Sequence, residues 1–378
     1  MIRLRDISTP ALLLNLDRFE HNLARMRQHL AGLGVPLRPH LKSAKSIEVA
    51  RRAMAAGEPR AMVSTLREAQ FYAGRGVQDL IYGVGITPAK LPRIGALRRE
   101  TGADVAVILD SLEQAQAVAS WSRANNDPLP VLIEIDVDGH RSGVGLTDAA
   151  ELIAIGRTLV DGGATLRGVL THAGASYALN RPEELATAAR TERATAVKGA
   201  EMLRAAGLPC PVVSMGSTPT AMFATDLAGV TEVRAGVYMF GDLVQAGIGT
   251  CSIDDIALSV LASVIGTRPE KGWIIVDAGW MALSQDRGTG SQRLDQGYGL
   301  VCDERGLTYP DLIVLEANQE HGIIGVRPGS RAKVPKLPVG SLVRILPNHA
   351  CATGGQHDRY QVVAGDVVVA EWQRANGW

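Results

Sequence analysis

The stretch Val35-Pro36-Leu37-Arg38-Pro39-His40-Leu41-Lys42 decides the fold, because it reads as a short strand that ends in a lysine. Ahead of it, apolar residues recur every three or four positions from Phe19 to Leu33, which predicts one buried face of a helix. Asp17 is the expected N-cap of that helix, with Glu20 closing a capping box, and Gly34 ends it. The main domain therefore begins with a helix, a tight turn and a strand that delivers Lys42 at its carboxyl end.

Seven further strand candidates follow, and segments of helical period lie between most of them, for example Leu112–Ala124 and Glu183–Ala206. The candidates are Met62–Thr65, Asp79–Tyr82, Val105–Leu109, Val131–Asp136, Leu166–Thr171, Val212–Met215 and Glu232–Ala235. This alternation argues for parallel strands, and the eight strands together predict an α/β fold, a (β/α)8 TIM barrel. A doubly wound open sheet is the alternative, but the sequence has no GxGxxG turn after the first strand.

The character of the sequence changes after about Cys251, where helical period gives way to apolar runs separated by turns. The β-like segments are Ile256–Ile265, Trp273–Asp277, Leu312–Leu315, Ser341–Leu346 and Tyr360–Trp372. They predict a C-terminal all-β domain, which the N-terminal strand Thr9–Leu14 joins. We expect the barrel to span residues 15–250 and the β domain to consist of residues 1–14 and 251–378.

Composition narrows the class of protein. The chain has 378 residues, 46% apolar and 21% charged, so it can bury a large core. Its formal net charge is zero, which favours neither nucleic acid nor a membrane surface as a partner. The N-terminus has no apolar signal-peptide region, and no run of about 18 apolar residues predicts a transmembrane helix. Four widely spaced cysteines without a CxxC pair are typical of a reduced, cytoplasmic setting.

Lys42 is the first candidate for chemistry, because the strand ends of an α/β barrel carry the active site. A lysine that is desolvated in a barrel mouth has a lowered pKa. Such an amine forms a Schiff base with an aldehyde, including pyridoxal phosphate. The alternative is a solvated basic loop, in which Lys42 and Lys45 have no chemical role.

Gly216-Ser217-Thr218-Pro219-Thr220 is the second candidate, and it directly follows the strand Val212–Met215. Glycine permits close backbone approach, the hydroxyl groups are donors, and Pro219 suits the first turn of a helix. A strand, a Gly-Ser-Thr turn and a helix start together predict a phosphate cradle, which Arg234–Tyr238 at the next strand end could complete. An ordinary capped turn is the alternative.

Two more strand ends carry polar side chains. In the loop Glu134–Gly145, Arg141 could bind a phenolate oxygen or a carboxylate, unless it is a surface arginine on a flexible loop. His172 and Tyr177 follow the strand Leu166–Thr171 and could line the same mouth, although a lone histidine is more often structural.

The β domain has one candidate of its own, His349 and Cys351 in Pro347-Asn348-His349-Ala350-Cys351. Side chains at i and i+2 point to the same side of an extended segment, and both residue types bind zinc. Taken alone, the pair is a weak signal, and a core cysteine beside a surface histidine is the alternative.

Taken together, these motifs resemble, over essentially the whole chain, the D-serine dehydratase and D-threonine aldolase family of pyridoxal-phosphate enzymes. The motifs that carry the resemblance are Arg38–Lys42, Asp136–Val144, Thr171–Gly174, Gly216–Thr220, Val233–Tyr238, Gln319-Glu320-His321-Gly322 and Pro347–Cys351. The resemblance implies an alanine-racemase-type barrel with a β domain, and a homodimer.

The resemblance also implies roles for individual residues. Lys42 would be the Schiff-base lysine, supported by His40. The other implied cofactor contacts are Arg141 at the phenolic oxygen, Tyr177 near the pyridine ring, His172, and Gly216, Ser217, Thr218, Gly236, Val237 and Tyr238 at the phosphate. The implied substrate contacts are Gln319, Glu320 and His321. His349 and Cys351 would bind a divalent metal, zinc above all, with magnesium or manganese as alternatives.

The reaction that the resemblance implies is dehydration of a D-3-hydroxy amino acid such as D-threo-3-hydroxyaspartate, D-serine or D-threonine, which gives a 2-oxo acid and ammonia. Three other functions stay open on this fold. An aldolase would cleave Cα–Cβ instead, but that branch more often has Asp in the place of Cys351. A racemase would need a second base, and a non-catalytic cofactor carrier would normally lack the β domain.

Overall fold

The structure is a computed structural model that describes residues 2–54, 59–147 and 149–378. The chain divides into two compact units. The β unit comprises Met1–Arg25 and Val237–Arg374, and the barrel unit comprises Met26–Gly236 and Ala375–Trp378. The boundary at 25/26 lies 11 residues after the predicted division at 14/15, and the boundary at 236/237 lies 14 residues before the predicted division at 250/251. Within the described residues, no helix is both long and apolar enough to cross a membrane.

The barrel unit contains an eight-stranded sheet in which every pair of neighbours is parallel. Its strands are β3 (Leu37–Pro39), β4 (Arg60–Val63), β5 (Asp79–Gly85), β6 (Asp104–Leu109), β7 (Pro130–Ile135), β8 (Thr165–Thr171), β9 (Val212–Met215) and β10 (Glu232–Ala235). β3 pairs with β10, and a parallel bridge between His40 and Met62 brings the end of β3 to β4, so the sheet nearly closes on itself. The predicted (β/α)8 barrel is confirmed.

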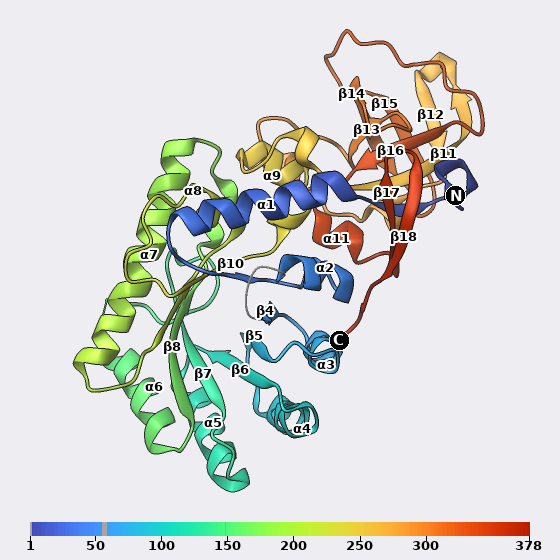
Figure 1. The fold of residues 1–378 in the computed structure, drawn as a ribbon. Coiled ribbons are helices and arrows are strands. Elements are labelled where there is room, and N and C mark those ends of the chain that lie inside the picture. Colours follow the sequence, from blue (N-terminus) through green and yellow to red (C-terminus); the bar gives the residue numbers. More distant parts are fainter. Residues whose placement is uncertain (1, 55–58, 148) are drawn as a thin grey trace. The chain divides into compact units, whose positions relative to one another are not determined.

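Helices lie outside these strands, as Figure 1 shows for the green and blue part of the chain. They are α2 (Ile47–Ala53), α3 (Leu66–Ala73), α4 (Leu91–Thr101), α5 (Leu112–Asn125), α6 (Ala149–Asp161), α7 (Pro182–Ala205) and α8 (Thr218–Phe223). One buried apolar cluster takes a side chain from each of several neighbouring strands: Met62, Ile81, Ala106, Ile108, Leu132 and Leu170. This core fixes the strands and therefore the loops at their carboxyl ends.

Two local predictions at the start of the barrel are wrong. Helix α1 (Leu16–Gly32) is capped by Asn15, whose Oδ1 accepts from the backbone N–H of Arg18 at 3.0 Å, so Asp17 lies inside the first turn. The first strand is also shorter than expected, because β3 ends at Pro39. The chain then turns, with the N–H of Lys45 donating to the carbonyl of Leu41 at 2.9 Å. Lys42 therefore lies in a tight turn just beyond the strand.

The β unit is built on one ten-stranded, mainly antiparallel sheet. Its strands are β1 (Ile2–Arg3), β2 (Ala11–Asn15), β11 (Leu258–Arg268), β12 (Trp273–Val276), β13 (Leu300–Cys302), β14 (Thr308–Ala317), β15 (Gly322–Val326), β16 (Leu342–Leu346), β17 (Arg359–Ala364) and β18 (Val367–Gln373). The N-terminal strand β2 lies inside the sheet, antiparallel to β11 and parallel to β17. The predicted C-terminal β domain is confirmed. It also contains the short helices α9 (Leu243–Ile248), α10 (Trp280–Leu283) and α11 (Ala350–Gly354). These helices were not predicted, because the sequence of this domain shows no helical period.

Candidate active site

Five loops bring polar residues to one end of the barrel, because parallel strands of a closed sheet present their carboxyl ends at the same mouth. Lys42 follows β3, Arg141 follows β7, His172 follows β8, Gly216 follows β9 and Gly236 follows β10. The charges of Lys42 and Arg141 both act on the His172 ring, which shows that the loops converge.

Lys42 itself is exposed, so the desolvation that we expected from the sequence is not present. Its backbone N–H faces Nδ1 of His40 at 3.5 Å. The other ring nitrogen of His40, Nε2, lies 3.5 Å from Oγ of Ser64. Burial lowers the pKa of His40 well below its ordinary value, and the charges of Lys42 and Arg234 lower it further. His40 is therefore a neutral support for the turn that carries Lys42.

His172 is held beside the loop that follows β9. Its Nδ1 lies 3.3 Å from the carbonyl oxygen of Gly216. Burial lowers the pKa of His172 to about 4, and the nearby positive charges of Arg234 and Lys42 act in the same direction. The ring is thus neutral at pH 7, with Nδ1–H donating to Gly216 and Nε2 left as an acceptor. The Tyr177 ring lies 6.4 Å from the His172 ring, centroid to centroid.

The Gly216–Thr220 turn has the features of an anion cradle. Gly216 has a φ of +132°, and a Cβ at this position would lie 2.2 Å from the carbonyl oxygen of Arg234, so only glycine fits. Ser217 caps α8, and Thr218 is the first, buried residue of that helix. A Cβ on Gly236 would lie 2.8 Å from the carbonyl oxygen of His40, which brings the loop after β10 against the Lys42 turn. Backbone N–H groups, hydroxyl groups and missing side chains fit a phosphate.

Two buried charged residues behind this cradle were not predicted as site residues. Glu192, on α7, accepts from the backbone N–H of Gly216 at 3.0 Å and from Oγ1 of Thr220 at 2.5 Å. Arg234, on β10, donates from Nη1 to Oγ of Ser214 at 2.9 Å. Arg234 stands in a motif that the sequence singled out, but Glu192 is one glutamate among many on a long amphipathic helix and carries no local signal.

Arg141 is exposed, with 61% of its side chain accessible. It lies 3.7 Å from the carboxylate of Glu134. Its loop is ordered by acids, since Oδ1 of Asp136 accepts from the N–H of Gly139 at 2.8 Å and Oδ2 of Asp138 accepts from Ala175 at 2.8 Å. Arg141 is therefore placed near the mouth but is not fixed by a short contact.

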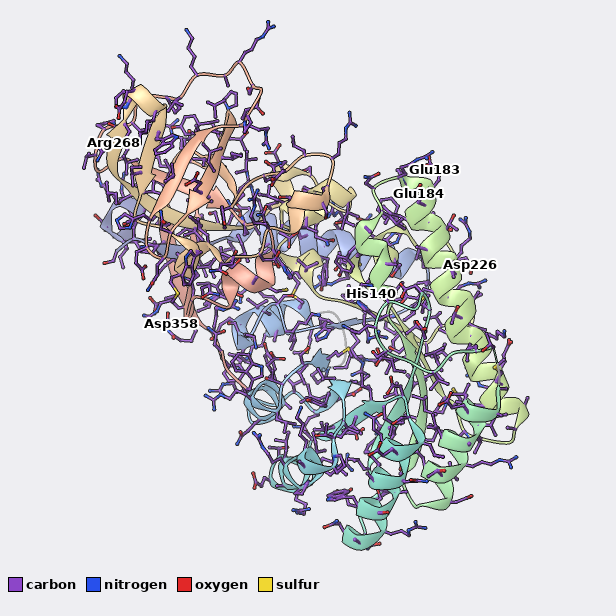
Figure 2. All side chains as sticks on the ribbon, turned by 180° about the vertical axis from the view of Figure 1, so that it is seen from behind. His140, Glu183, Glu184, Asp226, Arg268 and Asp358 are labelled. Carbon is purple, nitrogen blue, oxygen red and sulfur yellow. The ribbon has the colours of Figure 1, made fainter. Side chains whose placement is uncertain are left out.

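A cavity of about 440 Å³ lies on the outer side of this loop, between the start of α7 and the loops after β7 and β8. Asp138, Ser176 and Glu184 are among its lining residues. Figure 2 shows Glu183 and Glu184 at the start of α7, above His140.

The remaining predicted residues fall in the β unit. Val237 and Tyr238 are buried in a single 3-10 turn (Val237–Met239) directly after Gly236. Gln319, Glu320 and His321 are exposed in the turn between β14 and β15. Their roles toward phosphate and substrate stay predictions.

His349 and Cys351 lie in contact, but not for the reason that the sequence suggested. The segment is not extended, because His349 is the N-cap of α11 and Cys351 lies in the first turn of that helix. Nδ1 of His349 lies 2.7 Å from Oδ2 of Asp286, and the Cys351 side chain is a second hydrogen-bond partner of the ring. Burial opposes the charged ring, yet these two partners outweigh it and raise the pKa of His349 to about 11.

The backbone around this pair is anchored by buried polar residues. Oδ2 of Asp242, the N-cap of α9, accepts from the N–H of Ala350 at 2.9 Å. The Asn348 side chain accepts from Oγ1 of Thr289 at 3.0 Å and donates to the carbonyl of Gly297 at 2.7 Å. Asp242 and Asp286 were both missed, because each is far from His349 along the chain.

The donor set fits a catalytic transition-metal site. An imidazole and a thiol face each other, and a carboxylate on the second ring nitrogen is the usual support of a metal-binding histidine. Among residues 2–54, 59–147 and 149–378, no group of three or more His, Cys, Asp or Glu side chains could hold a metal. Two protein ligands would leave positions open for water and substrate.

Known proteins match both units. The family described as "Alanine racemase, N-terminal domain" matches residues 14–244, and the family described as "Putative serine dehydratase domain" matches residues 257–363. D-threo-3-hydroxyaspartate dehydratase of Delftia sp. (strain HT23) is 54% identical over 98% of each chain. D-threonine aldolase of Arthrobacter sp. is 31% identical over 97% of this chain and 92% of its own.

Solved structures agree with these matches. The D-threo-3-hydroxyaspartate dehydratase from Delftia sp. HT23 is similar with a TM-score of 0.98 and 53% identity, and the match covers 100% of each chain. A cysteine-to-alanine mutant of a D-threo-3-hydroxyaspartate dehydratase, in the metal-free form, is similar with a TM-score of 0.97, again at 53% identity over 100% of each chain.

Proposed function

Because this chain belongs to the family that joins an alanine racemase N-terminal domain to a serine dehydratase domain, we propose that it is a dehydratase of D-3-hydroxy amino acids that depends on pyridoxal phosphate and a divalent metal. The observation that carries the proposal is the 54% identity to a D-threo-3-hydroxyaspartate dehydratase over nearly the full length of both chains. The products would be a 2-oxo acid and ammonia.

The barrel residues would bind different parts of the cofactor. Lys42 would hold its aldehyde carbon. The turn Gly216, Ser217 and Thr218 would hold its phosphate through the two hydroxyl groups and the close backbone approach that Gly216 permits. When bound, the cofactor supplies an electron sink for the negative charge that develops at Cα. The neutral His172 ring can accept a hydrogen bond at Nε2 without adding a second positive charge beside Lys42.

Lys42 would also move the proton. Its Nζ would be the base that takes the Cα proton of the substrate. Two observations support this assignment: the side chain is exposed at the mouth, and its backbone is fixed in a tight turn beside His40. A fixed backbone with an exposed amine suits a group that would both hold the cofactor and take a proton.

His349 and Cys351 would hold the metal, which supplies a Lewis acid for the departing β-hydroxyl. Asp286 would keep the His349 ring oriented through the 2.7 Å contact to Nδ1. Zinc suits a nitrogen and sulfur donor pair better than magnesium or manganese, which prefer oxygen ligands. We therefore propose zinc.

Aldol cleavage is the second candidate, because a D-threonine aldolase is 31% identical over 97% of this chain. The two reactions differ in the bond that breaks, Cβ–O in dehydration and Cα–Cβ in aldol cleavage. The identity to the dehydratase is much higher, and Cys351 stands where we expect Asp more often in aldolases. Dehydration is therefore the better supported reaction.

Product identification tests the proposal. The loaded, metal-replete protein is incubated separately with D-serine, D-threonine and D-threo-3-hydroxyaspartate. We expect ammonia and a 2-oxo acid in equal amounts, most rapidly from D-threo-3-hydroxyaspartate. Glycine and an aldehyde would instead establish the aldolase, and conversion to the L-isomer would establish a racemase.

Cytoplasmic location and dimer formation stay part of the proposal. The four cysteines are free thiols, which supports a reducing compartment. Sedimentation of the purified protein measures the oligomeric state.

A further inference from the structure

Glu192 is a charged residue with a demanding environment. It lies in the middle of α7 and is fully buried, with 0% exposure. A buried carboxylate is costly unless hydrogen bonds or nearby charges compensate it. Glu192 lies directly behind a cradle that suits an anion. Packing alone therefore does not explain why a carboxylate is buried here.

Four donors surround this carboxylate. Oε1 accepts from Oγ1 of Thr171 at 3.2 Å, from the N–H of Ala173 at 3.2 Å and from the N–H of Gly216 at 3.0 Å. Oε2 accepts from Oγ1 of Thr220 at 2.5 Å. Since all four partners can donate, the carboxylate is satisfied as an acceptor only. Glu192 thereby ties the loop after β8 to the loop after β9.

This arrangement also fixes the hydroxyl hydrogens of the cradle. The Thr220 hydroxyl gives its hydrogen to Glu192, so its oxygen is left to accept from the N–H of Ser217 at 3.1 Å. The Ser176 hydroxyl gives its hydrogen to the carbonyl of Ala173 at 2.7 Å. Of these three hydroxyl groups, Ser217 is then the one whose hydrogen can turn toward an anion.

The negative charge of Glu192 is balanced inside the barrel. Arg234 is buried on β10, and Glu192 is the acid that acts most strongly on its charge. Arg234 also donates to the carbonyl of Thr171, the last residue of β8, two positions before Ala173. Arg234 therefore supplies the positive charge that faces the Glu192 carboxylate behind the phosphate site.

We propose that Glu192 is a positioning residue for the phosphate of the cofactor, acting through Gly216 N–H and through the hydroxyl groups of Thr220 and Ser217. The inference rests on the proposed function, because it takes pyridoxal phosphate as the ligand of the cradle. Glutamine at this position would keep the size of the side chain but place an NH2 group against N–H and O–H donors. The N–H and hydroxyl groups of the cradle would then no longer be held in position, while the rest of the barrel would keep its packing.

The experiment compares two ligands that differ only in the phosphate. Dissociation constants of pyridoxal phosphate and of pyridoxal are measured by absorbance on the apo form of the wild type, Glu192→Gln and Glu183→Gln. Glu183 is the matched control, since it lies on the same helix and is exposed. We expect Glu192→Gln to weaken pyridoxal phosphate roughly tenfold or more, as for loss of a hydrogen bond to a charged group, with pyridoxal weakened less than about twofold. Glu183→Gln should change neither.

Equal weakening of both ligands by Glu192→Gln, or of neither, would overturn the inference, since a merely structural role gives no preference for the phosphate. If Glu192→Gln does not fold, Thr220→Val is the deciding variant, because it removes the hydroxyl group that links Glu192 to the cradle. That variant must show the same selective loss. Failure of the wild type to bind pyridoxal phosphate at all would instead refute the proposed function, so the two failures are distinguishable.

Discussion

His172 gives a prediction that can be worked out in free energy. Burial and the nearby charges of Arg234 and Lys42 lower its pKa from 6.5 to about 4. We consider the substitution His172→Asn, in which the amide nitrogen can still donate to the carbonyl of Gly216 as Nδ1 does at 3.3 Å. The variant keeps this contact and removes the titrating group.

The sign and size of the effect follow from proton linkage. Below pH 6.5 the unfolded chain binds a proton at this histidine, whereas the folded chain resists protonation until about pH 4. The contribution to stability is therefore complete above pH 6.5, decreases as the pH falls from 6.5 to 4, and is gone below that. One pKa unit corresponds to about 1.4 kcal/mol, so the loss over this range is roughly 3 kcal/mol at most.

Two measurements on the apo protein check this. An NMR titration should show one histidine signal with a midpoint near pH 4 that is missing from His172→Asn. Denaturant unfolding should show a smaller loss of stability between pH 7 and pH 4 in His172→Asn than in the wild type. His140→Asn is the control, since it removes an exposed histidine of a neighbouring loop and should leave the His172 signal in place. A His172 midpoint near 6.5 would refute the reasoning.

Four other changes test the candidate site. Lys42→Ala should abolish the adduct that borohydride fixes on the protein with pyridoxal phosphate, as read by peptide mass spectrometry; an adduct that persists at full yield would remove Lys42 from its role. Chelation should stop turnover and leave that adduct intact, so activity in a protein shown to be metal-free would contradict the metal assignment. Asp286→Asn should weaken zinc about 10- to 100-fold in a competition with a chelating dye at pH 8, because the support of the His349 ring is lost, while exposed Asp358→Asn should not. Gly216→Ala should lower the affinity for pyridoxal phosphate by about tenfold or more, because its Cβ meets backbone; Gly207→Ala, with positive φ but open space, measures backbone strain alone.

The barrel could be predicted because its strands are continuous apolar runs bounded by turn residues. The bounds of β9 and β10 match the predicted ranges Val212–Met215 and Glu232–Ala235. The first strand was drawn too long because Leu41 is apolar and buried, although the regular strand ends at Pro39 and Leu41 already lies in the turn that follows. Patterns of apolar residues report burial well and backbone conformation less well.

The site could be predicted only where the residues that contact each other are also neighbours in the sequence. Ser217 and Thr220 cap one helix, so their relation is local and visible in the sequence. Glu192 and Asp286 act on residues that only the fold brings close, and no spacing along the chain marks them. The sequence placed the His349 and Cys351 side chains together on the ground of an extended segment, whereas a helix start brings them into contact. Their role as metal ligands stays a prediction.

The position of β2 has a consequence for how the chain is made. Ala11–Asn15 leaves the ribosome before the whole barrel, but its partners in the sheet are β11 and β17, which emerge after it. All the strands of the barrel sheet, β3 to β10, emerge before β11 and β17. Leu12, Leu13 and Leu14, buried at the end, must therefore stay without their native cover throughout barrel synthesis. A chain that stalls before Arg359 would carry this apolar strand unpaired on one edge, which makes early termination a route to aggregation rather than to a stable fragment.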